Sequence, residues 1–288
     1  MSSVPKFARK ILAIMKNAKR QLTKLSHGGD VIKQGETFGD LVNDTDIRAD
    51  RVLGLFFQTE LAKIQGVARI SVEGLEDLNL RKEGMLICVD PIDGSLNYKL
   101  RGRLIGNPYT AVVTVFSTVD RPVFGGAVFA AILDLRPRSP DLFCAWQACD
   151  GSLHAQLNGE SMSTSRETKL DPGSQIIMTE TYYPLNRQHL LQLFEGQKGN
   201  FSRLGSAAYE MALVSSGTAT AFICISQKNH ELGATQLLVR AAGGVAVDWD
   251  GNSIESRAYD FRVQTPVILA ANQSIATEFC SRIQTLSL

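Results

Sequence analysis

The sequence predicts a mixed fold, with an α+β first half followed by an α/β second half. Between residues 68 and 157, runs rich in Val, Ile and Phe follow one another with little helical periodicity. From residue 176 onward, strand-like and helical runs alternate, which is typical of α/β architecture. The change of pattern near Ser165 to Pro172 predicts two domains, residues 1–170 and 171–288.

Bulk composition indicates a globular protein that is neither strongly basic nor strongly acidic. The 288 residues are 44% hydrophobic and 20% charged, and 30 Lys and Arg balance 29 Asp and Glu. A net charge of +1 gives no support for a nucleic-acid or membrane partner. The longest nearly apolar stretch, residues 123–133, is too short to cross a bilayer. Five scattered cysteines without metal spacing indicate reduced thiols in a cytoplasmic protein.

In the first half, an amphipathic helix is expected first. Residues 5–25 carry apolar side chains at three- and four-residue steps, and Gly28 with Gly29 ends the pattern. Asp46 stands at the N-cap position of a second helical run that reaches Ile64. Strands are then expected at residues 68–73, 85–90, 109–116, 123–133, 142–148 and 153–157, with a hairpin turn at Asp150-Gly151 between the last two.

In the second half, the expected elements alternate. Strands are predicted at residues 176–178, 220–225, 245–249 and 267–271. Helices are predicted at residues 186–194, 207–215, 231–242 and 274–284. Gly217 and the pair Gly243-Gly244 stand where two of these helices end.

The segment Asp90-Pro-Ile-Asp-Gly-Ser95 is the strongest chemical signal. A buried-looking strand ends in Asp90, Pro91 cannot continue the ladder, and Asp93 with Gly94 opens the next segment. Two carboxylates three residues apart at a strand end can converge on one Mg²⁺, which prefers oxygen ligands. If a helix starts near Ser95, its first N–H groups would point at a phosphate. The competing interpretation, an ordinary Asp-Pro and Asp-Gly turn, is equally compatible with this spacing.

Two further acids stand at element boundaries within fifty residues of this turn. Glu73 ends a strand-like run, so it would leave the same sheet edge as Asp90 if the two strands are neighbours. Asp46 begins a helix. Each acid alone is more typical of a cap or a surface residue. Together, the four acids within fifty residues favour a shared Mg²⁺ site over four unrelated caps or turn residues.

These motifs resemble the inositol monophosphatase family, which belongs to the Mg²⁺-dependent, Li⁺-sensitive superfamily that includes fructose-1,6-bisphosphatases and nucleotide 3′-phosphatases. Residues 90–97 resemble its Asp-Pro-(Ile/Leu)-Asp-Gly-(Thr/Ser) signature, and residues 41–46 resemble its Val-Thr-x-x-Asp element. Residues 71–74 stand where the family has Gly-Glu-Glu. Residues 204–208 resemble its Gly-(Ser/Thr)-Ala-Ala substrate loop, and residues 231–244 resemble a helix that ends in Glu-Ala-Gly-Gly.

The resemblance implies a Mg²⁺-dependent phosphatase that hydrolyses a small phosphate monoester, such as a phosphorylated sugar, cyclitol or nucleotide. It also implies a five-layer αβαβα sugar-phosphatase fold, a homodimer, two or three Mg²⁺ ions and inhibition by Li⁺. It implies that the first domain carries most metal ligands and that the second carries the substrate loop and Glu231. The implied metal ligands are Glu73, Asp90, the Ile92 carbonyl, Asp93 and Glu231. The implied catalytic residues, which orient a metal-activated water, are Glu73, Ser95 and Asp46. The implied substrate contacts are Asp93, Gly94, Ser95, Gly205, Ser206, Ala207, Cys224 and His230.

Three departures from the family pattern bear on the substrate. Trp-Asp in the family becomes His230-Glu231, an acid in the substrate pocket becomes Cys224, and the second Glu of Gly-Glu-Glu becomes Gly74. A thiol accepts hydrogen bonds from sugar hydroxyls poorly. The alternatives are therefore a fructose-1,6-bisphosphatase or nucleotide 3′-phosphatase, or a catalytically silent metal-binding relative.

Overall fold

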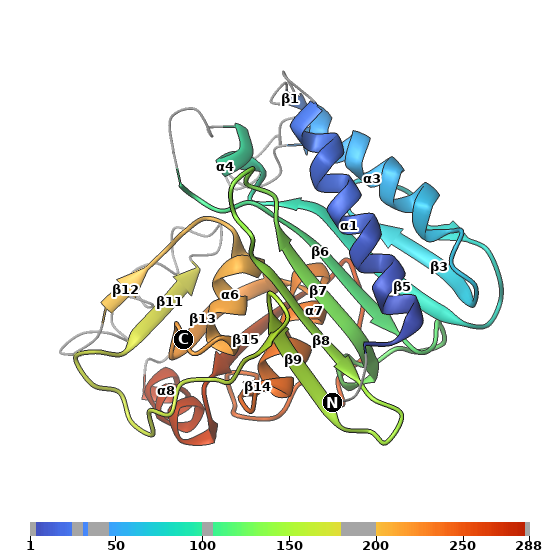
Figure 1. Cartoon of the computed structure of the whole chain (residues 1–288). Helices are drawn as coiled ribbons and strands as arrows, with labels where there is room; N and C mark the ends of the chain where they lie inside the picture. The colour runs from blue at the N-terminus through green and yellow to red at the C-terminus, as the bar shows by residue number, and fades with distance from the viewer. Residues whose placement is uncertain (1–3, 25–30, 34–45, 100–105, 180–199, 286–288) are drawn as a thin grey trace.

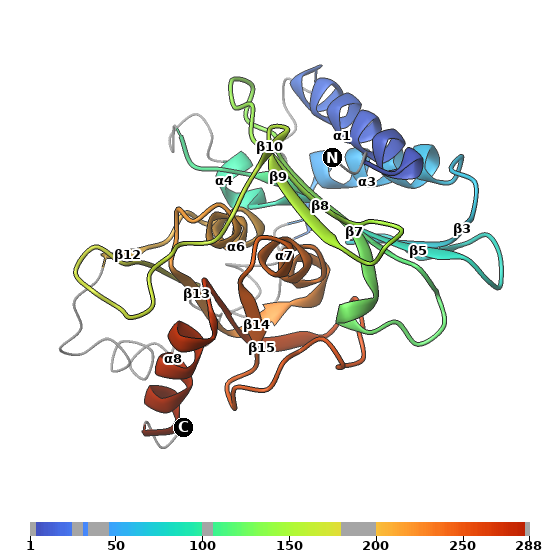
Figure 2. The same cartoon turned by 60° about the horizontal axis from the view of Figure 1, so that its bottom comes forward.

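The computed structural model describes residues 4–24, 31–33, 46–99, 106–179 and 200–285. Within them the chain forms five layers in the order αβαβα (Figures 1 and 2). The outer helices α1 (Lys6–Lys24) and α3 (Arg48–Leu61) cover one face of an eight-stranded sheet. Helices α6 (Ala207–Ser215) and α7 (Asn229–Ala241) lie between that sheet and a five-stranded sheet. The last layer is α8 (Gln273–Thr285), so the expected layered fold is confirmed.

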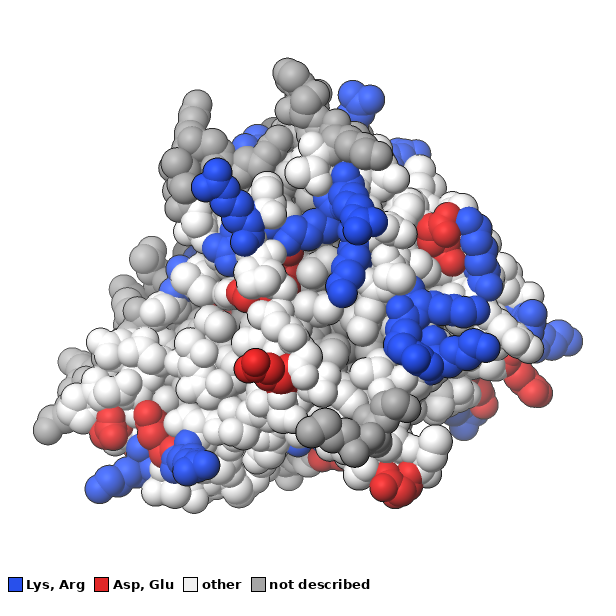
Figure 3. All heavy atoms as spheres, viewed as in Figure 1, with Lys and Arg blue, Asp and Glu red and all other residues white. Residues whose placement is uncertain are grey.

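Helix α1 shows why the first predicted helix forms. Its apolar positions Ala8, Ile11, Met15 and Ala18 are buried, as the periodicity predicts. Its polar face carries seven Lys and Arg and no acid, and Figure 3 shows these basic side chains along the helix. Lys19 is turned inward, where its Nζ donates to the carbonyl oxygens of Asp134 and Ser139 at 2.8 and 2.6 Å.

The second helix begins later than the sequence suggests. Asp46 is paired with Lys33 in a two-stranded ribbon formed by β1 (Val31–Lys33) and β2 (Asp46–Ile47). Ile47 therefore separates Asp46 from the first residue of α3, Arg48. The N-cap interpretation of Asp46 is wrong, because strand pairing holds its backbone. The proposed end of α1 at Gly28 and Gly29 falls outside the described residues.

The eight-stranded sheet has the order β10-β9-β8-β7-β6-β5-β3-β4. Its strands are β3 (Val67–Val72), β4 (Leu78–Asn79), β5 (Met85–Asp93), β6 (Thr110–Phe116), β7 (Ala127–Asp134), β8 (Leu142–Gln147), β9 (Leu153–Leu157) and β10 (Glu160–Ser161). The six predicted strands and the hairpin at Gly151, where φ is +84°, are confirmed. The run from Val123 starts differently, with a 3₁₀ turn at Phe124–Gly126 before β7. The short strands β4 and β10 carry too little pattern to predict.

Strand β5 does not end at Asp90 as the proline suggested. It continues to Asp93, and its register against β6 shifts between Asp90, opposite Val112, and Asp93, opposite Thr110. Two residues of β5 face one of β6 there, which is a β-bulge. Pro91 is accommodated in the bulge, where no ladder N–H is required. The bulge brings both aspartates to the same end of the sheet.

The five-stranded sheet has the order β12-β11-β13-β15-β14. Its strands are β11 (Gln175–Thr179), β12 (Asn200–Ser202), β13 (Ala221–Lys228), β14 (Val245–Val247) and β15 (Gln264–Ala270). The four predicted strands and the helices now labelled α6, α7 and α8 are confirmed, whereas β12 was not predicted. The helix expected at residues 186–194 lies outside the described residues.

The two halves share a hydrophobic core. One cluster joins buried side chains of the first sheet, such as Val112 and Ile132, to those of α6, α7 and β13, such as Met211, Leu238 and Phe222. The division into domains 1–170 and 171–288 stays a prediction. Among the described residues, none of the helices combines the length and the apolar character needed to cross a membrane. All five cysteines are free thiols, and only Cys149 is exposed.

Candidate active site

Four carboxylates from different parts of the chain meet at one end of the large sheet. Glu73 follows β3, Asp90 and Asp93 belong to the bulged end of β5, and Glu231 lies in the first turn of α7. Strands β3 and β5 run in parallel with Val72 opposite Val89, so Glu73 and Asp90 leave the same edge, as expected. Bringing α7 against this edge adds the acid from the second half.

The ligand atoms of these residues form two overlapping groups. Glu73, Asp90 and His230 make one, and Asp90, Asp93 and Glu231 make the other, with the ligand atoms of each group within 4.8 Å of one another. Asp90 belongs to both groups. The set fits divalent cations of the Mg²⁺ type because all but one of the side chains offer carboxylate oxygen. Two neighbouring ions bridged by a shared aspartate would suit this arrangement.

The carboxylates of this cluster are buried and repel one another. Asp90 is 1% exposed, and burial together with the negative charges of Glu73 and Asp93 raises its pKa well above the ordinary value. Burial and Asp93 likewise raise the pKa of Glu231. The Glu231 carboxylate is held by Gln227, whose side-chain amide donates to Oε2. A cation between these carboxylates would relieve the repulsion, so the electrostatics fit a metal as well as the geometry does.

Asp93 connects the cluster to helix α6. Its Oδ1 accepts the backbone N–H of Ala207 at 3.2 Å, and its Oδ2 accepts the N–H of Ala208 at 2.9 Å. The Ser206 hydroxyl also donates to Oδ2. The helix has no cap bond from Ser206 itself, so Asp93 supplies the cap from the other sheet. Burial raises the pKa of Asp93, and the bonds from Ser206 and Ala208 oppose that rise.

Glu73 is paired with two basic side chains. Lys228 Nζ donates to Glu73 Oε1 at 3.0 Å, and His230 Nε2 lies 3.4 Å from the same oxygen. His230 Nε2 also lies 3.8 Å from Asp90 Oδ2 and 3.7 Å from Glu231 Oε1, and its ring packs on Phe261. Burial raises the pKa of Glu73, but the two basic neighbours outweigh it and bring the pKa to about 2. His230 therefore lies among the side chains that could hold a metal ion.

Ser95 is the residue that the resemblance assigns to orienting the water. It begins the short helix α4 (Ser95–Lys99), which is the helix start expected after the acidic turn. Its Oγ is 2.8 Å from the Ile92 carbonyl oxygen and 2.9 Å from Asp50 Oδ2. The side chain of Asp46, the expected partner, lies outside the described side chains. Asp50 lies in the first turn of α3, four residues after Asp46, and was not identified from the sequence.

The loop before α6 is held on two sides. Asn97 Nδ2 donates to the carbonyl oxygens of Pro108 and Leu204 at 2.7 and 2.8 Å. Glu210 Oε1, which is buried, accepts the N–H of Gly205 at 2.8 Å and that of Leu204. Neither Asn97 nor Glu210 was assigned a role from the sequence, although Asn97 ends the 90–97 motif and Glu210 lies two residues after the 204–208 motif. Their bonds fix the loop at the edge of the carboxylate cluster.

Two glycines allow the loop and the acidic turn to approach closely. Gly94 has φ +81°, and a Cβ there would lie 3.1 Å from the Gly205 carbonyl oxygen. Gly205 has φ +80°, and its Cβ would lie 3.1 Å from the Asn97 side chain. Positive φ is costly for residues other than glycine. The predicted site residues Gly94, Gly205, Ser206 and Ala207 are therefore brought together with Asp93.

Cys224, an expected substrate contact, lies within the core between the sheets. It lies in β13 opposite Val267 of β15 and is fully buried in the core between the sheets. Burial, with a smaller contribution from the negative charge of Glu231, raises the pKa of its thiol to about 12. A neutral, buried thiol offers a substrate little more than a weak acceptor.

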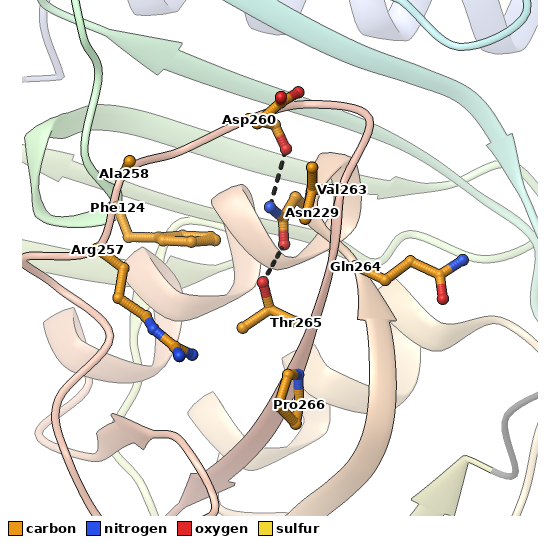
Figure 4. A pocket seen from close by; sticks show the side chains of 9 residues that line it. All are labelled: Phe124, Asn229, Arg257, Ala258, Asp260, Val263, Gln264, Thr265 and Pro266. Carbon is orange, nitrogen blue, oxygen red and sulfur yellow. Dashed lines mark hydrogen bonds between the residues drawn. The ribbon is translucent and has the colours of Figure 1, made fainter.

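Asn229, the first residue of α7, lines a hollow of the structure. This hollow has a volume of about 380 Å³ and is lined by Phe124, Asn229, Arg257, Ala258, Asp260, Val263, Gln264, Thr265 and Pro266 (Figure 4). Asn229 Nδ2 donates to the Asp260 carbonyl oxygen, and Asn229 Oδ1 accepts the Thr265 hydroxyl, both at 2.8 Å. None of the four carboxylates lines this hollow. Asn229 thus anchors the turn that carries His230 and Glu231.

Comparisons with known proteins identify the family of this chain. The model of the inositol monophosphatase family matches residues 3–287. An inositol monophosphatase of Dictyostelium discoideum is 28% identical over 255 residues, 85% of this chain and 83% of the relative.

Two solved structures share the fold. The extragenic suppressor protein SuhB of Bartonella henselae superimposes with a TM-score of 0.76 at 19% identity, covering 96% of this chain and 97% of that one. An IMPase/NADP phosphatase complexed with Mg²⁺ and phosphate has a TM-score of 0.73 at 17% identity, covering 95% and 93%. The chain therefore belongs to the inositol monophosphatase family of phosphatases.

Proposed function

We propose that the chain hydrolyses a small phosphate monoester with Mg²⁺ bound between Glu73, Asp90, Asp93 and Glu231. The observation that carries the proposal is the pair of overlapping ligand groups that share Asp90. The Ile92 carbonyl oxygen is the remaining ligand of the expected set, and it accepts a hydrogen bond from the Ser95 hydroxyl at 2.8 Å. The solved relative that holds Mg²⁺ and phosphate supports the choice of ion and ligand.

Bound Mg²⁺ would supply charge neutralisation of the phosphate and a lowered pKa for the attacking water. Ser95 and Glu73 orient that water, and the hydroxyl of Ser95 can pass a proton to Asp50, whose Oδ2 lies 2.9 Å away. Asp50 would assist in this step beside Asp46, whose role as implied by the resemblance stays a prediction. On the leaving-group side, Asp93, Ser206 and Ala207 lie together and would contact the alcohol of the substrate.

A panel of phosphate monoesters, each assayed with Mg²⁺, with chelator and with Li⁺, tests this function. Inositol phosphates, sugar bisphosphates and nucleotide 3′-phosphates form the panel. Phosphate release that needs Mg²⁺ supports the proposal. Absence of turnover on every ester by a protein that still binds Mg²⁺ in calorimetry would favour the silent metal-binding relative.

A bisphosphatase or nucleotide phosphatase is the second candidate, and Cys224 is the observation that favours it. The family acid that would contact inositol hydroxyls is replaced by a buried thiol. Changing Cys224 to Asp should raise hydrolysis of inositol phosphates relative to the other esters, if that position contacts substrate. An unchanged ratio would remove Cys224 from the specificity argument.

The proposal includes three properties that rest on family membership: a homodimer, inhibition by Li⁺ and a cytoplasmic location. The five free thiols support the last of these, because reducing compartments keep thiols unpaired. Sedimentation velocity tests the dimer, the Li⁺ arm of the panel tests inhibition, and microscopy of the tagged full chain tests the location.

A further inference from the structure

Lys228 is a charged side chain inside the site that neither the motifs nor the proposed roles include. It is the last residue of β13 and directly precedes α7. Its Nζ donates to Glu73 Oε1 at 3.0 Å, and its side chain is 19% exposed. This ion pair joins the second half of the chain to the first across 155 residues.

The position of Lys228 matters because Glu73 belongs to a metal-ligand group. Glu73 shares that group with Asp90 and His230, whose Nε2 lies 3.4 Å from the same Glu73 oxygen. A divalent cation in this group would therefore approach a carboxylate that already has an ammonium partner. Two cations drawn to one carboxylate repel each other, and each weakens the binding of the other.

We propose that Lys228 is a positioning residue, a built-in counter-ion that competes with the divalent cation for Glu73 and lowers the Mg²⁺ affinity of the Glu73–Asp90–His230 group. The inference rests on the proposed Mg²⁺ site. In the absence of metal, Lys228 holds Glu73 by neutralising part of the acidic cluster. When the cation binds, it must share Glu73 with Lys228 or displace the lysine. The ion pair therefore lowers the Mg²⁺ affinity of the site but keeps Glu73 ordered when no metal is bound.

The ion pair of Lys63 with Glu60 offers a matched control. Lys63 Nζ donates to Glu60 Oε1 at 2.6 Å, which is the same type of contact, but on an exposed surface beside α3. Replacing Lys63 with Met changes the net charge of the protein by the same amount as replacing Lys228 with Met. The comparison separates a local effect at Glu73 from a general effect of protein charge.

Calorimetric titration of the full chain with Mg²⁺ tests the inference. Lys228→Met should bind Mg²⁺ about tenfold more tightly than wild type at the affected group, because both a competitor and a repulsive charge are removed. Lys228→Gln should move in the same direction, and it keeps a hydrogen-bond donor if the Met variant fails to fold. Lys228→Arg and Lys63→Met should stay within about twofold of wild type. The Mg²⁺ concentration for half-maximal phosphate release should fall in parallel.

The outcomes separate this inference from the proposed function. Unchanged or weaker Mg²⁺ binding by folded Lys228→Met and Lys228→Gln would overturn the counter-ion role and leave the function standing. A merely structural lysine would give that result, because its loss would loosen Glu73. A wild-type protein that binds no Mg²⁺ would overturn the proposed function itself.

Discussion

Replacing Asp90 with Asn should stabilise the metal-free protein while abolishing phosphate release. Asp90 is 1% exposed, and burial and the charges of neighbouring carboxylates raise its pKa well above the ordinary 3.8. Asn removes that charge. It keeps an oxygen that can accept the Ile92 N–H, which now lies 3.0 Å from Asp90 Oδ1. Conserving shape while removing repulsion should raise the free energy of unfolding.

The magnitude has an upper bound set by protonation. The charge of Asp90 cannot destabilise the folded protein by more than the free energy needed to protonate that carboxyl group. For a group whose ordinary pKa is 3.8, this free energy is about 5 kcal/mol at about pH 7.5. Because neighbouring carboxylates share protons, we expect about 2 kcal/mol, or roughly 4 °C in Tm for a chain of this size.

The pH dependence follows with a definite sign. The folded protein keeps the Asp90 proton to a higher pH than the unfolded chain does. Stability is therefore present below the ordinary pKa of 3.8 and is lost as pH rises through the raised pKa. Over that pH range, the free energy of unfolding of Asp90→Asn should decline less steeply than that of wild type.

Thermal unfolding in chelator and in saturating Mg²⁺ provides the assay. In chelator, Asp90→Asn should melt above wild type. In Mg²⁺, wild type should gain stability and the variant should gain little. Asp120→Asn, the same chemical change in an exposed turn, is the control. A variant no more stable than wild type in chelator would refute the claim that the carboxylates repel one another.

Three further substitutions test the surroundings of the cluster. Asp93→Asn should lower kcat/KM at least about a hundredfold and also lower Tm, because an amide has one acceptor oxygen where two now accept the Ala207 and Ala208 N–H groups; activity within about tenfold would exclude Asp93 as a metal ligand. Glu210→Ala should raise KM and cost about 1 kcal/mol in urea unfolding, because the N–H groups of Leu204 and Gly205 lose a buried carboxylate acceptor; an unchanged KM would show that the loop does not contact substrate. Gly205→Ala should cost about 2 kcal/mol from its positive φ and the close Asn97 side chain. Gly159→Ala, with φ +91° and no atom within 4 Å, should cost less, and equal losses of Tm would mean that the Asn97 contact is unimportant.

The sequence predicted the long, strongly periodic elements well, because burial alone determines their pattern. Helix α1 and strands β6 and β8 have almost the expected bounds. The continuation of β5 beyond Asp90 was missed because a bulge that accommodates Pro91 depends on the register of the neighbouring strand. Short strands such as β12 depend on partners rather than on their own three residues.

In the candidate site, the residues that belong to motifs could be predicted from the sequence. Glu73, Asp90, Asp93 and Glu231 were placed together from motifs, and the structure brings their carboxylates together. Their assigned roles stay predictions. Lys228 was missed because its contact with Glu73 joins distant segments, and such contacts leave no spacing signal in a single sequence. Glu210 was missed because it lies outside the loop motif whose N–H groups it accepts.

The cap that Asp93 places on α6 limits how the site can move. Drawing the two sheets apart by even an ångström or two would break the bonds from Ala207, Ala208 and Ser206, which are charge-assisted and buried. A hinge opening between the halves is therefore costly. Substrates should enter and leave past the surrounding loops while the metal-binding end of the fold stays shut. Changes of substrate preference within this scaffold would then arise from loop sequence, with the angle between the sheets held constant.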